Sequence, residues 1–324
     1  MTYDRNYSVV GLGQCAFDVL GRVSEYPPAD AKAELSETLL QGGGPVATAL
    51  VTLARLGFDT AFLGRVGDDH FGSRIREGLL AEGVDCRGLL TDPGGSSQFA
   101  FITVEERSGR RNIFWSRGSA RPLSPAEIDP AVIKSSRVLH LDGLQHEASL
   151  AAARIAREAG VATVLDGGTC REGTGELLPL IDHLVVSEKF ACQIAPGKEL
   201  RFALEKLLAF GARAVTVTIG EKGCYTLSSE GEEFHQPAFP VMAVDTTGCG
   251  DVFHGGYIYG LLQEWDLRPT VRFAAACAAL KTRALGGRTA IPTLAEVEGF
   301  LEFFPDGDPQ PRKPKEVVPH SGKP

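Results

Sequence analysis

Short apolar segments alternate with helical segments through the middle of the chain, and this alternation restricts the possible folds more than any other feature. Strand-like runs are expected at 138–141, 161–165, 183–186 and 214–219, with helical stretches such as 149–159 and 200–210 between them. Neighbouring parallel strands need crossover connections of this kind. The pattern predicts an α/β fold with a doubly wound, mainly parallel sheet flanked by helices.

Two segments interrupt this alternation in the N-terminal half. Residues 17–40 keep an extended character, and the Pro27-Pro28 pair prevents a continuous helix there. Residues 97–117 contain two extended runs joined by a polar turn, which is typical of a hairpin. Both segments are expected to form small β excursions outside the main alternation.

Length and composition are those of a globular enzyme. A chain of 324 residues with 43% hydrophobic and 23% charged residues can bury a large core, and residues 1–304 are expected to form one domain. Residues 305–324 lack apolar periodicity and are expected to be disordered. The net charge of -8 and the absence of a basic run argue against a nucleic-acid or membrane partner. The seven scattered cysteines favour a cytoplasmic location.

The segment 245–257 is the most informative for chemistry, and it reads DTTGCGDVFHGGY before a helical run. Gly248 and Gly250 allow backbone N–H groups to converge on an anion, and the positive end of the helix dipole reinforces them. Asp251 stands at the helix start, where a carboxylate could accept the proton of an attacking hydroxyl. An aspartate that only caps the helix fits the same position, so these residues alone leave both interpretations open.

Three glycine-containing blocks give the chain a wider resemblance. Residues 245–257 are close to the form D-T-x-G-A-G-D-x-F-x-G-G, and two upstream blocks cover 42–57 and 64–72. In residues and order, the blocks resemble the signatures of the ribokinase-like, or PfkB, carbohydrate kinases over about residues 8–304. The resemblance implies a ribokinase-like domain with a β-sheet lid made from the two excursions, ATP-dependent phosphorylation of a sugar, and a homodimer that pairs through the lid.

The resemblance also implies roles for individual residues near the reacting groups. Asp251 would be the general base, and the turn of Gly248, Cys249 and Gly250 would be the anion hole. Cys249 occupies a position that is often alanine in this family, and nothing in the sequence makes it a nucleophile.

Substrate contacts carry over in the same way. Asp18 would bind substrate hydroxyls, and the backbone of Gly42 and Gly43 would approach the sugar. Arginines at 107, 110, 111, 117 and 121 gather around the second lid excursion, where one could reach a substrate carboxylate or phosphate. Arg117 is the one that we select as a substrate-binding candidate, although solvated lid charges are the more common situation for a single arginine.

The nucleotide and cation contacts implied by the resemblance lie in the C-terminal half. The positions that match ATP contacts are Ser187, Thr218, Gly220, Gly223, Ala276, Ala279 and Gly287. Asp245 and Thr247 match positions that lie near a monovalent cation, K+, in some members. Mg2+ is expected because phosphoryl transfer from ATP needs charge neutralisation.

Two departures from the family pattern affect these expectations. Many members have Asn where Ala47 stands, so one substrate hydrogen bond is missing or comes from elsewhere. The usual N-x-x-E element is replaced by SEKF at 187–190, which displaces Glu188 and leaves the magnesium ligands unassigned.

The sequence leaves several substrates open. Residues 11–27 look like ketohexokinases, and residues 286–292 look like the sulfofructose kinase branch, so a primary hydroxyl of a ketose such as fructose is favoured. Trp115 and Leu144 stand where polar sulfonate-binding residues are expected, which argues against sulfofructose itself. Residues 114–120 are similar to the lid segment of 2-keto-3-deoxygluconate kinases, and nucleoside and phosphosugar kinases are further alternatives.

Features of two other functional classes occur in the sequence. Residues 11–16 fit the dinucleotide-binding form G-x-G-x-x-A, but that fingerprint must open a helix and the following residues look extended. A nucleotide-binding sensor without catalysis would be favoured by loss of Asp251 or of its glycine turn, and both are intact.

Overall fold

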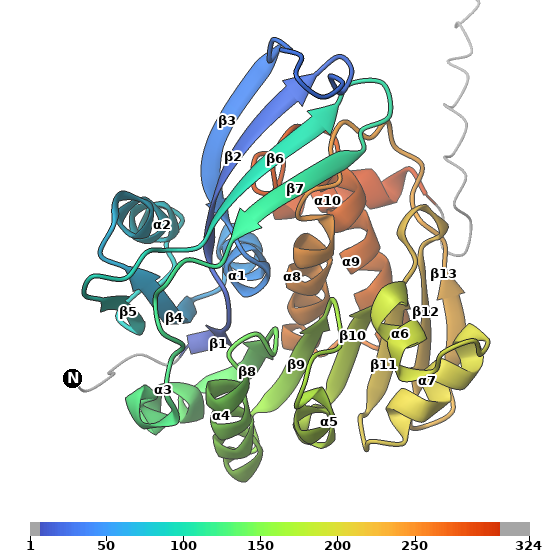
Figure 1. Ribbon diagram of the computed structural model, residues 1–324. Helices are drawn as coiled ribbons and strands as arrows, with labels where there is room; N and C mark the ends of the chain where they lie inside the picture. Colours follow the sequence, from blue (N-terminus) through green and yellow to red (C-terminus); the bar gives the residue numbers. More distant parts are fainter. Residues whose placement is uncertain (1–6, 305–324) are drawn as a thin grey trace, which may run out of the picture.

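A nine-stranded sheet forms the body of the protein in the computed structural model, which describes residues 7–304 (Figure 1). Its strands follow the order β13 (Glu233–Gln236), β12 (Cys224–Ser228), β11 (Ala214–Thr218), β10 (His183–Ser187), β9 (Ala162–Gly167), β8 (Ser136–Leu141), β1 (Tyr7–Leu12), β4 (Thr60–Gly67) and β5 (Leu89–Asp92). The strands from β11 to β5 run parallel, whereas β12 pairs antiparallel with β11 and β13 pairs antiparallel with β12. The mainly parallel sheet predicted from the alternation is therefore confirmed.

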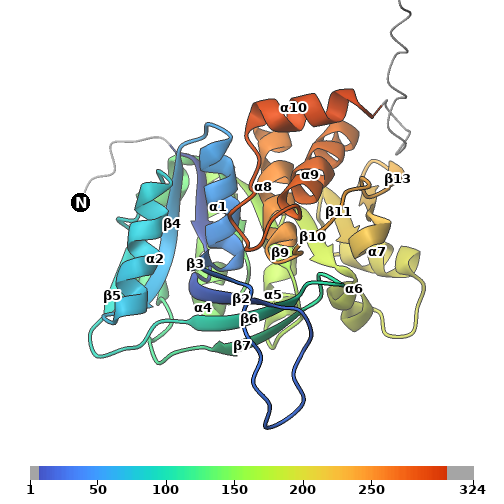
Figure 2. The same ribbon diagram turned by 90° about the horizontal axis from the view of Figure 1, so that it is seen from above.

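Helices cover both faces of this sheet, because neighbouring residues of a strand point to opposite faces. Val9 of β1 joins one core cluster and Val10 joins the other. The helices are α1 (Pro45–Arg55), α2 (His70–Ala81), α3 (Pro130–Lys134), α4 (His146–Ala159), α5 (Thr174–Leu177), α6 (Glu188–Ile194), α7 (Leu200–Leu208), α8 (Cys249–Leu262), α9 (Leu267–Lys281) and α10 (Leu294–Glu302). On the first face α8 packs between α1 and α9 (Figure 2), while α4 and α7 pack on the second.

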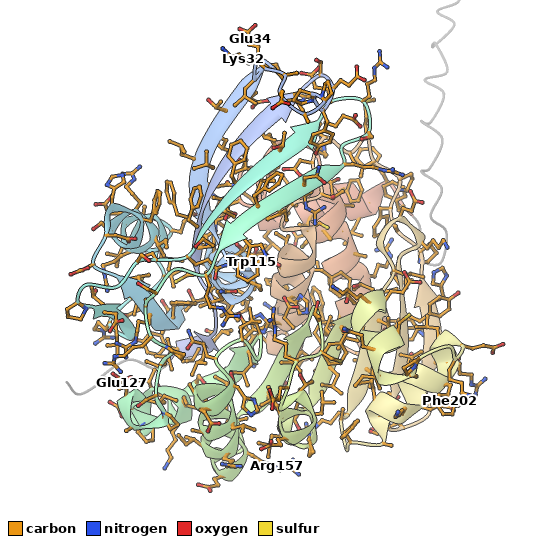
Figure 3. The ribbon with its side chains drawn as sticks, in the orientation of Figure 1. Lys32, Glu34, Trp115, Glu127, Arg157 and Phe202 are labelled. Carbon is orange, nitrogen blue, oxygen red and sulfur yellow. The ribbon has the colours of Figure 1, made fainter. Side chains whose placement is uncertain are left out.

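A second, four-stranded sheet lies beside the main sheet and is made from the two predicted excursions (Figure 1). Its strands follow the order β3 (Glu37–Gly43), β2 (Ala16–Val23), β6 (Phe99–Glu105) and β7 (Arg111–Ser116). β2 and β6 pair in parallel, and the two outer pairs are antiparallel. We call this sheet the lid. Its edge strand β7 is exposed along its whole length, including Trp115 (Figure 3).

The order of the main sheet reverses between β1 and β8. From β1 the chain leads to β4 and β5 on one side, whereas β8 leads to β9, β10 and β11 on the other. Ligands of open α/β sheets bind at such a reversal, outside the carboxyl ends of the strands. The fold therefore points to the carboxyl ends of β1 and β8 before any side chain is considered.

Some expectations fall outside what the structure tests. The predicted disorder of 305–324 lies outside the described residues. The assignment of residues 1–304 to one domain stays a prediction. Within residues 7–304 no helix is both long and apolar enough to cross a membrane.

Candidate active site

The glycine-rich turn leads into α8 as the sequence predicts. Gly248 is the residue before the helix and has φ 74°, a left-handed conformation that favours glycine. A Cβ on Gly248 would lie 2.8 Å from Cα of Gly287, so the turn also packs closely against the segment after α9. A Cβ on Gly250 would meet no atom within 4 Å. The space beside Gly250 is therefore open to a ligand.

Asp251 is the third residue of α8 and does not cap it. Within the described residues no side chain caps this helix start, and no hydrogen bond is formed by the Asp251 carboxylate. Burial raises the pKa of Asp251 to about 6, and the nearby charge of Asp166 acts in the same direction. The nearby charges of His254, Arg288 and Arg111 oppose this rise. Asp251 is thus an unpaired, partly buried carboxylate at the positive end of a helix.

Two further carboxylates lie at the carboxyl ends of central strands. Asp142 follows β8, and its Oδ2 accepts a hydrogen bond from the backbone N–H of Gln14 after β1, at 2.7 Å. Asp166 lies in β9 with its Oδ2 3.5 Å from Nδ1 of His254. Burial raises the pKa of Asp142 to about 7 and also raises the pKa of Asp166. The negative charge of Asp166 adds to the raised pKa of both Asp142 and Asp251, and the charge of Asp251 adds to that of Asp142.

Asp18 reaches the same region from the lid strand β2. Only 7% of Asp18 is exposed, and burial raises its pKa to about 7 although the positive charge of Arg288 opposes the rise. The negative charge of Asp251 adds to the rise. A Cβ on Gly43 would lie 2.1 Å from Oδ2 of Asp18. Glycine at 43 is therefore needed for Asp18 to lie against β3.

Arg288 is a buried cation that the sequence analysis did not place in the site. Its Nε donates to Oγ1 of Thr48 at 3.2 Å, and its Nη2 donates to the carbonyl oxygen of Gly43 at 3.1 Å. A Cβ on Gly42 would lie 2.3 Å from its Nη1. The two glycines predicted to approach the sugar are thus also the residues that admit Asp18 and Arg288. Arg288 lies outside any strand or helix, so no apolar periodicity in the sequence indicates that its side chain is buried.

The lid brings Arg111 to the turn, whereas the sequence analysis selected Arg117. Arg117 is exposed, and no hydrogen bond or ion pair to it is found in residues 7–304. Arg111 instead donates from Nη1 to Oγ1 of Thr246 at 2.5 Å. A Cβ on Gly109 would lie 3.2 Å from the carbonyl oxygen of Val244, so the β6–β7 turn lies against the segment before α8 at this point.

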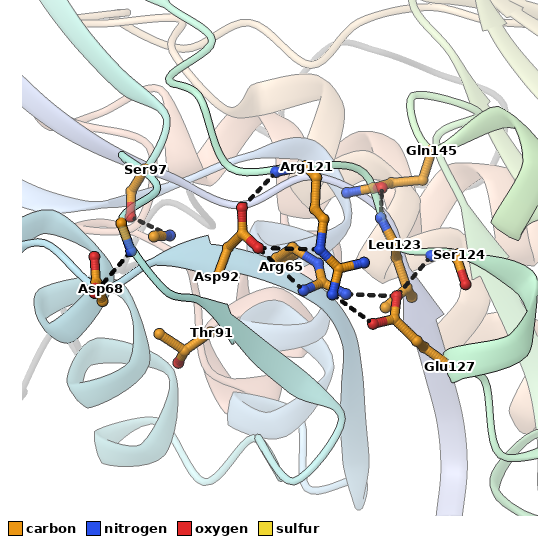
Figure 4. Close-up of polar contacts among 12 residues, drawn as sticks. Arg65, Asp68, Thr91, Asp92, Ser97, Arg121, Leu123, Ser124, Glu127 and Gln145 are labelled. Carbon is orange, nitrogen blue, oxygen red and sulfur yellow. Dashed lines mark hydrogen bonds and ion pairs between the residues drawn. The ribbon is translucent and has the colours of Figure 1, made fainter.

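An ion network around the buried Arg65 fastens the chain where it returns from the lid to the main sheet (Figure 4). Nη2 of Arg65 in β4 lies 2.5 Å from Oε2 of Glu127, and Nη1 lies 3.7 Å from Asp92. Arg121 pairs with the same two carboxylates at 3.1 Å each. The hydrogen bond from Arg65 is the main reason why the pKa of Glu127 falls to about 2. The network fixes one end of the lid to the main sheet.

The predicted nucleotide contacts lie on neighbouring elements at one end of the main sheet. Ser187 ends β10 and caps α6, with its Oγ accepting from the N–H of Phe190 at 3.1 Å. Thr218 ends β11, and Gly220 follows with φ 62° and open space where a Cβ would be. Gly223 has φ 91°, and a Cβ there would lie 2.0 Å from the carbonyl oxygen of Gln236. The close packing accounts for Gly223 as a turn glycine.

The remaining predicted contacts come from α9 and the segment after it. Ala276 is fully buried in the core, whereas Ala279 is 9% exposed. A side-chain contact to a nucleotide is therefore easier for Ala279 than for Ala276. Gly287 lies opposite Gly248 across the turn.

Asp245 and Thr247, predicted to lie near a monovalent cation, bind each other. Oδ1 of Asp245 accepts from the N–H of Thr247 at 2.8 Å and from its Oγ1 at 2.7 Å. Oδ2 accepts from the N–H of Gly286 at 2.8 Å. The Asp245 carbonyl oxygen accepts from Nζ of Lys281 at 2.9 Å.

A large, mainly parallel sheet with helices on both faces and a small β lid defines a ribokinase-like α/β protein. A putative ribokinase structure from Agrobacterium tumefaciens superposes with a TM-score of 0.84 and 28% identity, covering 92% of this chain and 98% of that one. A putative ribokinase II from E. coli, solved in complex with ATP and Mg2+, gives a TM-score of 0.80 and 25% identity over 91% and 99% of the two chains.

The family follows from the sequence match. Residues 6–294 match the pfkB family carbohydrate kinase profile, and the chain belongs to this family of carbohydrate kinases. The ATP-dependent ribose-1-phosphate kinase of Halopiger xanaduensis is 32% identical over 90% of this chain and 97% of its own. Probable fructokinase-4 of Arabidopsis thaliana is 30% identical over 91% and 96%. The resemblance to PfkB kinases is therefore confirmed.

Proposed function

We propose that this sugar kinase transfers a phosphoryl group from ATP to a primary hydroxyl of a small sugar, with a ketose such as fructose as the favoured acceptor. The observation that carries the proposal is the placement of Asp251. Its carboxylate forms no hydrogen bond, has a raised pKa and lies beside an open glycine turn. The fructokinase relative adds support for a ketose.

Asp251 is assigned as the general base. With a pKa of about 6 it is ionised at neutral pH, yet it holds a proton better than an ordinary carboxylate. The sugar hydroxyl donates its proton to Asp251 as its oxygen attacks the terminal phosphorus of ATP, and the bond from that phosphorus to ADP breaks. His254 lies between Gly250 and Asp166, so it is placed to fix the geometry around the base.

The anion hole is assigned to the backbone of Gly248, Cys249 and Gly250. The first N–H groups of a helix have no partner within the helix, and they point toward an anion bound at its start. Negative charge develops on the transferred phosphoryl oxygens, and preorganised donors stabilise that charge without having to reorient. The open space at Gly250 admits such a group.

The sugar is assigned to the space between the lid and the turn. Asp18 would accept hydrogen bonds from sugar hydroxyls, with the backbone of Gly42 and Gly43 beside it. Arg288 lies where it could supply the donor that Ala47 lacks, because it is bonded to Thr48 at the start of α1. Arg117 stays a weaker candidate, because its side chain is exposed.

ATP is assigned to the strand ends and turns that carry Ser187, Thr218 and Gly220, together with the segment at Ala279 and Gly287. The E. coli relative described as bound to ATP and Mg2+ supports this use of the fold. Magnesium usually binds through substrate phosphates, waters and only one or two carboxylates. Asp142 and Asp166 are the carboxylates that would bind it, and the negative charge of Asp166 raises the cost of ionising Asp142. When bound, the metal neutralises phosphate charge.

A sugar phosphate is the second candidate acceptor. The relative named ribose-1-phosphate kinase favours it, and so do the cations Arg111 and Arg288 near the candidate base. A ketose and a ribose phosphate can both offer a primary hydroxyl to the same base.

We assign a homodimer through the lid and a cytoplasmic location. Ile113, Phe114 and Trp115 are 46%, 62% and 55% exposed on the edge strand β7, and an exposed apolar edge is a natural pairing surface. All seven cysteines are free thiols, as is usual in a reducing compartment.

The test is a coupled assay of ADP release across ketoses, aldoses, sugar acids, nucleosides and sugar phosphates, with ATP and Mg2+. We expect the highest kcat/KM for a ketose, and product analysis should place the phosphate on a primary hydroxyl. A preference for a sugar phosphate would replace the first candidate by the second. No turnover with any of these groups would contradict the proposal.

A further inference from the structure

Lys281 is a fully buried lysine directly beneath the anion turn. It is the last residue of α9 and has no exposed surface. Its Nζ donates to the carbonyl oxygen of Asp245, the residue that opens the turn, at 2.9 Å. The same ammonium feels the charges of Asp245 and Asp251. A positive charge is thus built into the floor of the site.

Burying this ammonium is unfavourable unless nearby groups compensate it. Burial lowers the pKa of Lys281, and the carboxylate of Asp245 is the main group that opposes this. Asp245 is itself fully buried. The Asp245 carboxylate therefore compensates the ammonium through its charge, while the direct contact of Lys281 is with the Asp245 carbonyl oxygen.

A free monovalent cation would need the oxygen atoms that the protein already uses here. K+ is held by rings of carbonyl oxygens and similar ligands. The carbonyl oxygen of Asp245 is bonded to Lys281, and both carboxylate oxygens of Asp245 are bonded to Thr247 or Gly286. The residues present do not fit the K+ site that the sequence predicts at Asp245 and Thr247.

We propose that the Lys281 ammonium is a built-in monovalent cation of the anion turn, which makes catalysis independent of K+. An ammonium carries the same single positive charge as K+ and binds the same kind of oxygen atoms. Because it is covalently attached, it occupies the place at any salt composition. It holds Asp245 at the start of the turn and adds positive potential under the phosphoryl group. The inference rests on the proposed kinase reaction.

The ammonium also couples the anion turn to the segment of Gly286 and Gly287 after α9. Asp245 binds Gly286 through Oδ2, and Gly287 packs against Gly248. Removal of the charge beneath Asp245 should therefore loosen both sides of the turn at once. Lys281 is a positioning residue in this scheme, because it acts on the phosphoryl group through the turn.

The first test needs no variant. We expect the kcat of the wild-type enzyme to be the same in chloride salts of K+, Na+ and tetramethylammonium at equal ionic strength. Activation of the wild type by K+, with a saturable dependence on its concentration, would overturn the proposal.

The second test is chemical rescue of Lys281→Ala. Loss of the cation should lower kcat by about 100-fold, the scale reported for removal of one preorganised donor. NH4+ or K+ should restore activity with saturation, whereas tetramethylammonium, which is much larger than an ammonium group and has no N–H donor, should not. Lys281→Met fills the vacated space without a charge, so its kcat should also be low and neither NH4+ nor K+ should restore it. A folded Lys281→Ala that no small cation rescues would contradict the proposal.

Thermal unfolding separates this inference from the reaction itself. NH4+ and K+ should raise the Tm of Lys281→Ala relative to tetramethylammonium, and they should leave the wild type and Lys281→Met unchanged. Lys206→Ala is the matched control, because Lys206 also donates to a backbone carbonyl oxygen but is exposed. If no sugar is phosphorylated, the kinase proposal fails, while the Tm shifts still decide the cation assignment. Equal Tm shifts in Lys206→Ala and Lys281→Ala would overturn it.

Discussion

Arg111 of the lid donates a hydrogen bond to Oγ1 of Thr246, 135 residues away in the chain and two residues before the anion turn. Its positive charge also favours the ionised form of Asp251. The bond is therefore a direct link between lid position and the candidate base.

Replacement of Arg111 should impair catalysis more than replacement of Arg117. For Arg111→Gln we expect kcat/KM to fall by about 10- to 100-fold, which corresponds to about 1.5–3 kcal/mol for a hydrogen bond to a charged group. Arg117→Gln is the matched control and should change kcat/KM little. Steady-state kinetics of both variants are the measurement, and a larger loss in Arg117→Gln would restore the assignment made from the sequence.

Asp251→Asn should abolish turnover while ATP binding survives. The amide cannot accept the hydroxyl proton, but nucleotide contacts come from other elements. In the wild type, kcat should fall as the pH drops through about 6, because burial and Asp166 raise the pKa of Asp251 and its protonated form is inactive. An ADP-release assay between pH 5 and 8, with calorimetric ATP binding, tests this. A kcat that stays constant down to about pH 5 would show that a group other than Asp251 sets the pH dependence.

Asp18→Asn should weaken sugar binding and alter stability with pH. The folded pKa of about 7 exceeds the unfolded value, so the native state holds the extra proton between about pH 4 and pH 7. Ionisation of Asp18 therefore costs stability as the pH rises through this window. The variant should be more stable than the wild type at pH 8 by about 1–3 kcal/mol, and similar at pH 4. Urea unfolding at both values is the measurement, and a variant less stable at pH 8 would contradict the pKa direction.

Two glycine substitutions should have different consequences. Gly250→Ala meets no atom within 4 Å, so the variant should keep its Tm but lose kcat as the methyl group enters the phosphoryl space. Gly43→Ala would place a Cβ 2.1 Å from Asp18, so KM should rise and the Tm should fall. Gly78→Ala is the control in an open helical position, where alanine should stabilise by about 0.5–1 kcal/mol. Wild-type kcat in Gly250→Ala would exclude the turn as the anion hole.

Trp115→Glu should separate the proposed dimer. In a two-fold symmetric interface the same edge of both subunits meets, so the new carboxylate would lie near its own copy and the two negative charges would repel. Light scattering should give a monomer for the variant and a dimer for the wild type. A wild-type monomer at assay concentration would exclude the lid interface.

The sequence predicted the fold and the candidate base for different reasons. Strands and helices were predicted because apolar periodicity and glycine positions reflect local structure, and Asp251 lies in one continuous motif. β12 and β13 were missed because they form an antiparallel hairpin at one end of the main sheet, outside the alternation. Arg111 and Arg117 could not be separated, because the side chain that reaches the turn depends on the strand register.

Other site residues could not be predicted because only tertiary packing places them. Asp142 and Asp166 come together through the order of the main sheet. Lys281 and Arg288 are charged residues that composition assigns to the surface, and their burial depends on partners far away in the sequence.

The parallel pairing of β2 with β6 has a consequence for how the site is made. Phe17 pairs in register with Phe99. β2 therefore lacks its parallel neighbour β6 until some eighty further residues have been synthesised. Asp18 can lie against β3 earlier, but its neighbour on the other side, Ala100 of β6, is made only then, and α8 follows much later still. A ribosome-bound fragment that ends before α8 would therefore lack the candidate base Asp251 and be catalytically incomplete. Activity should appear last in biosynthesis, when the C-terminal helices pack against α1.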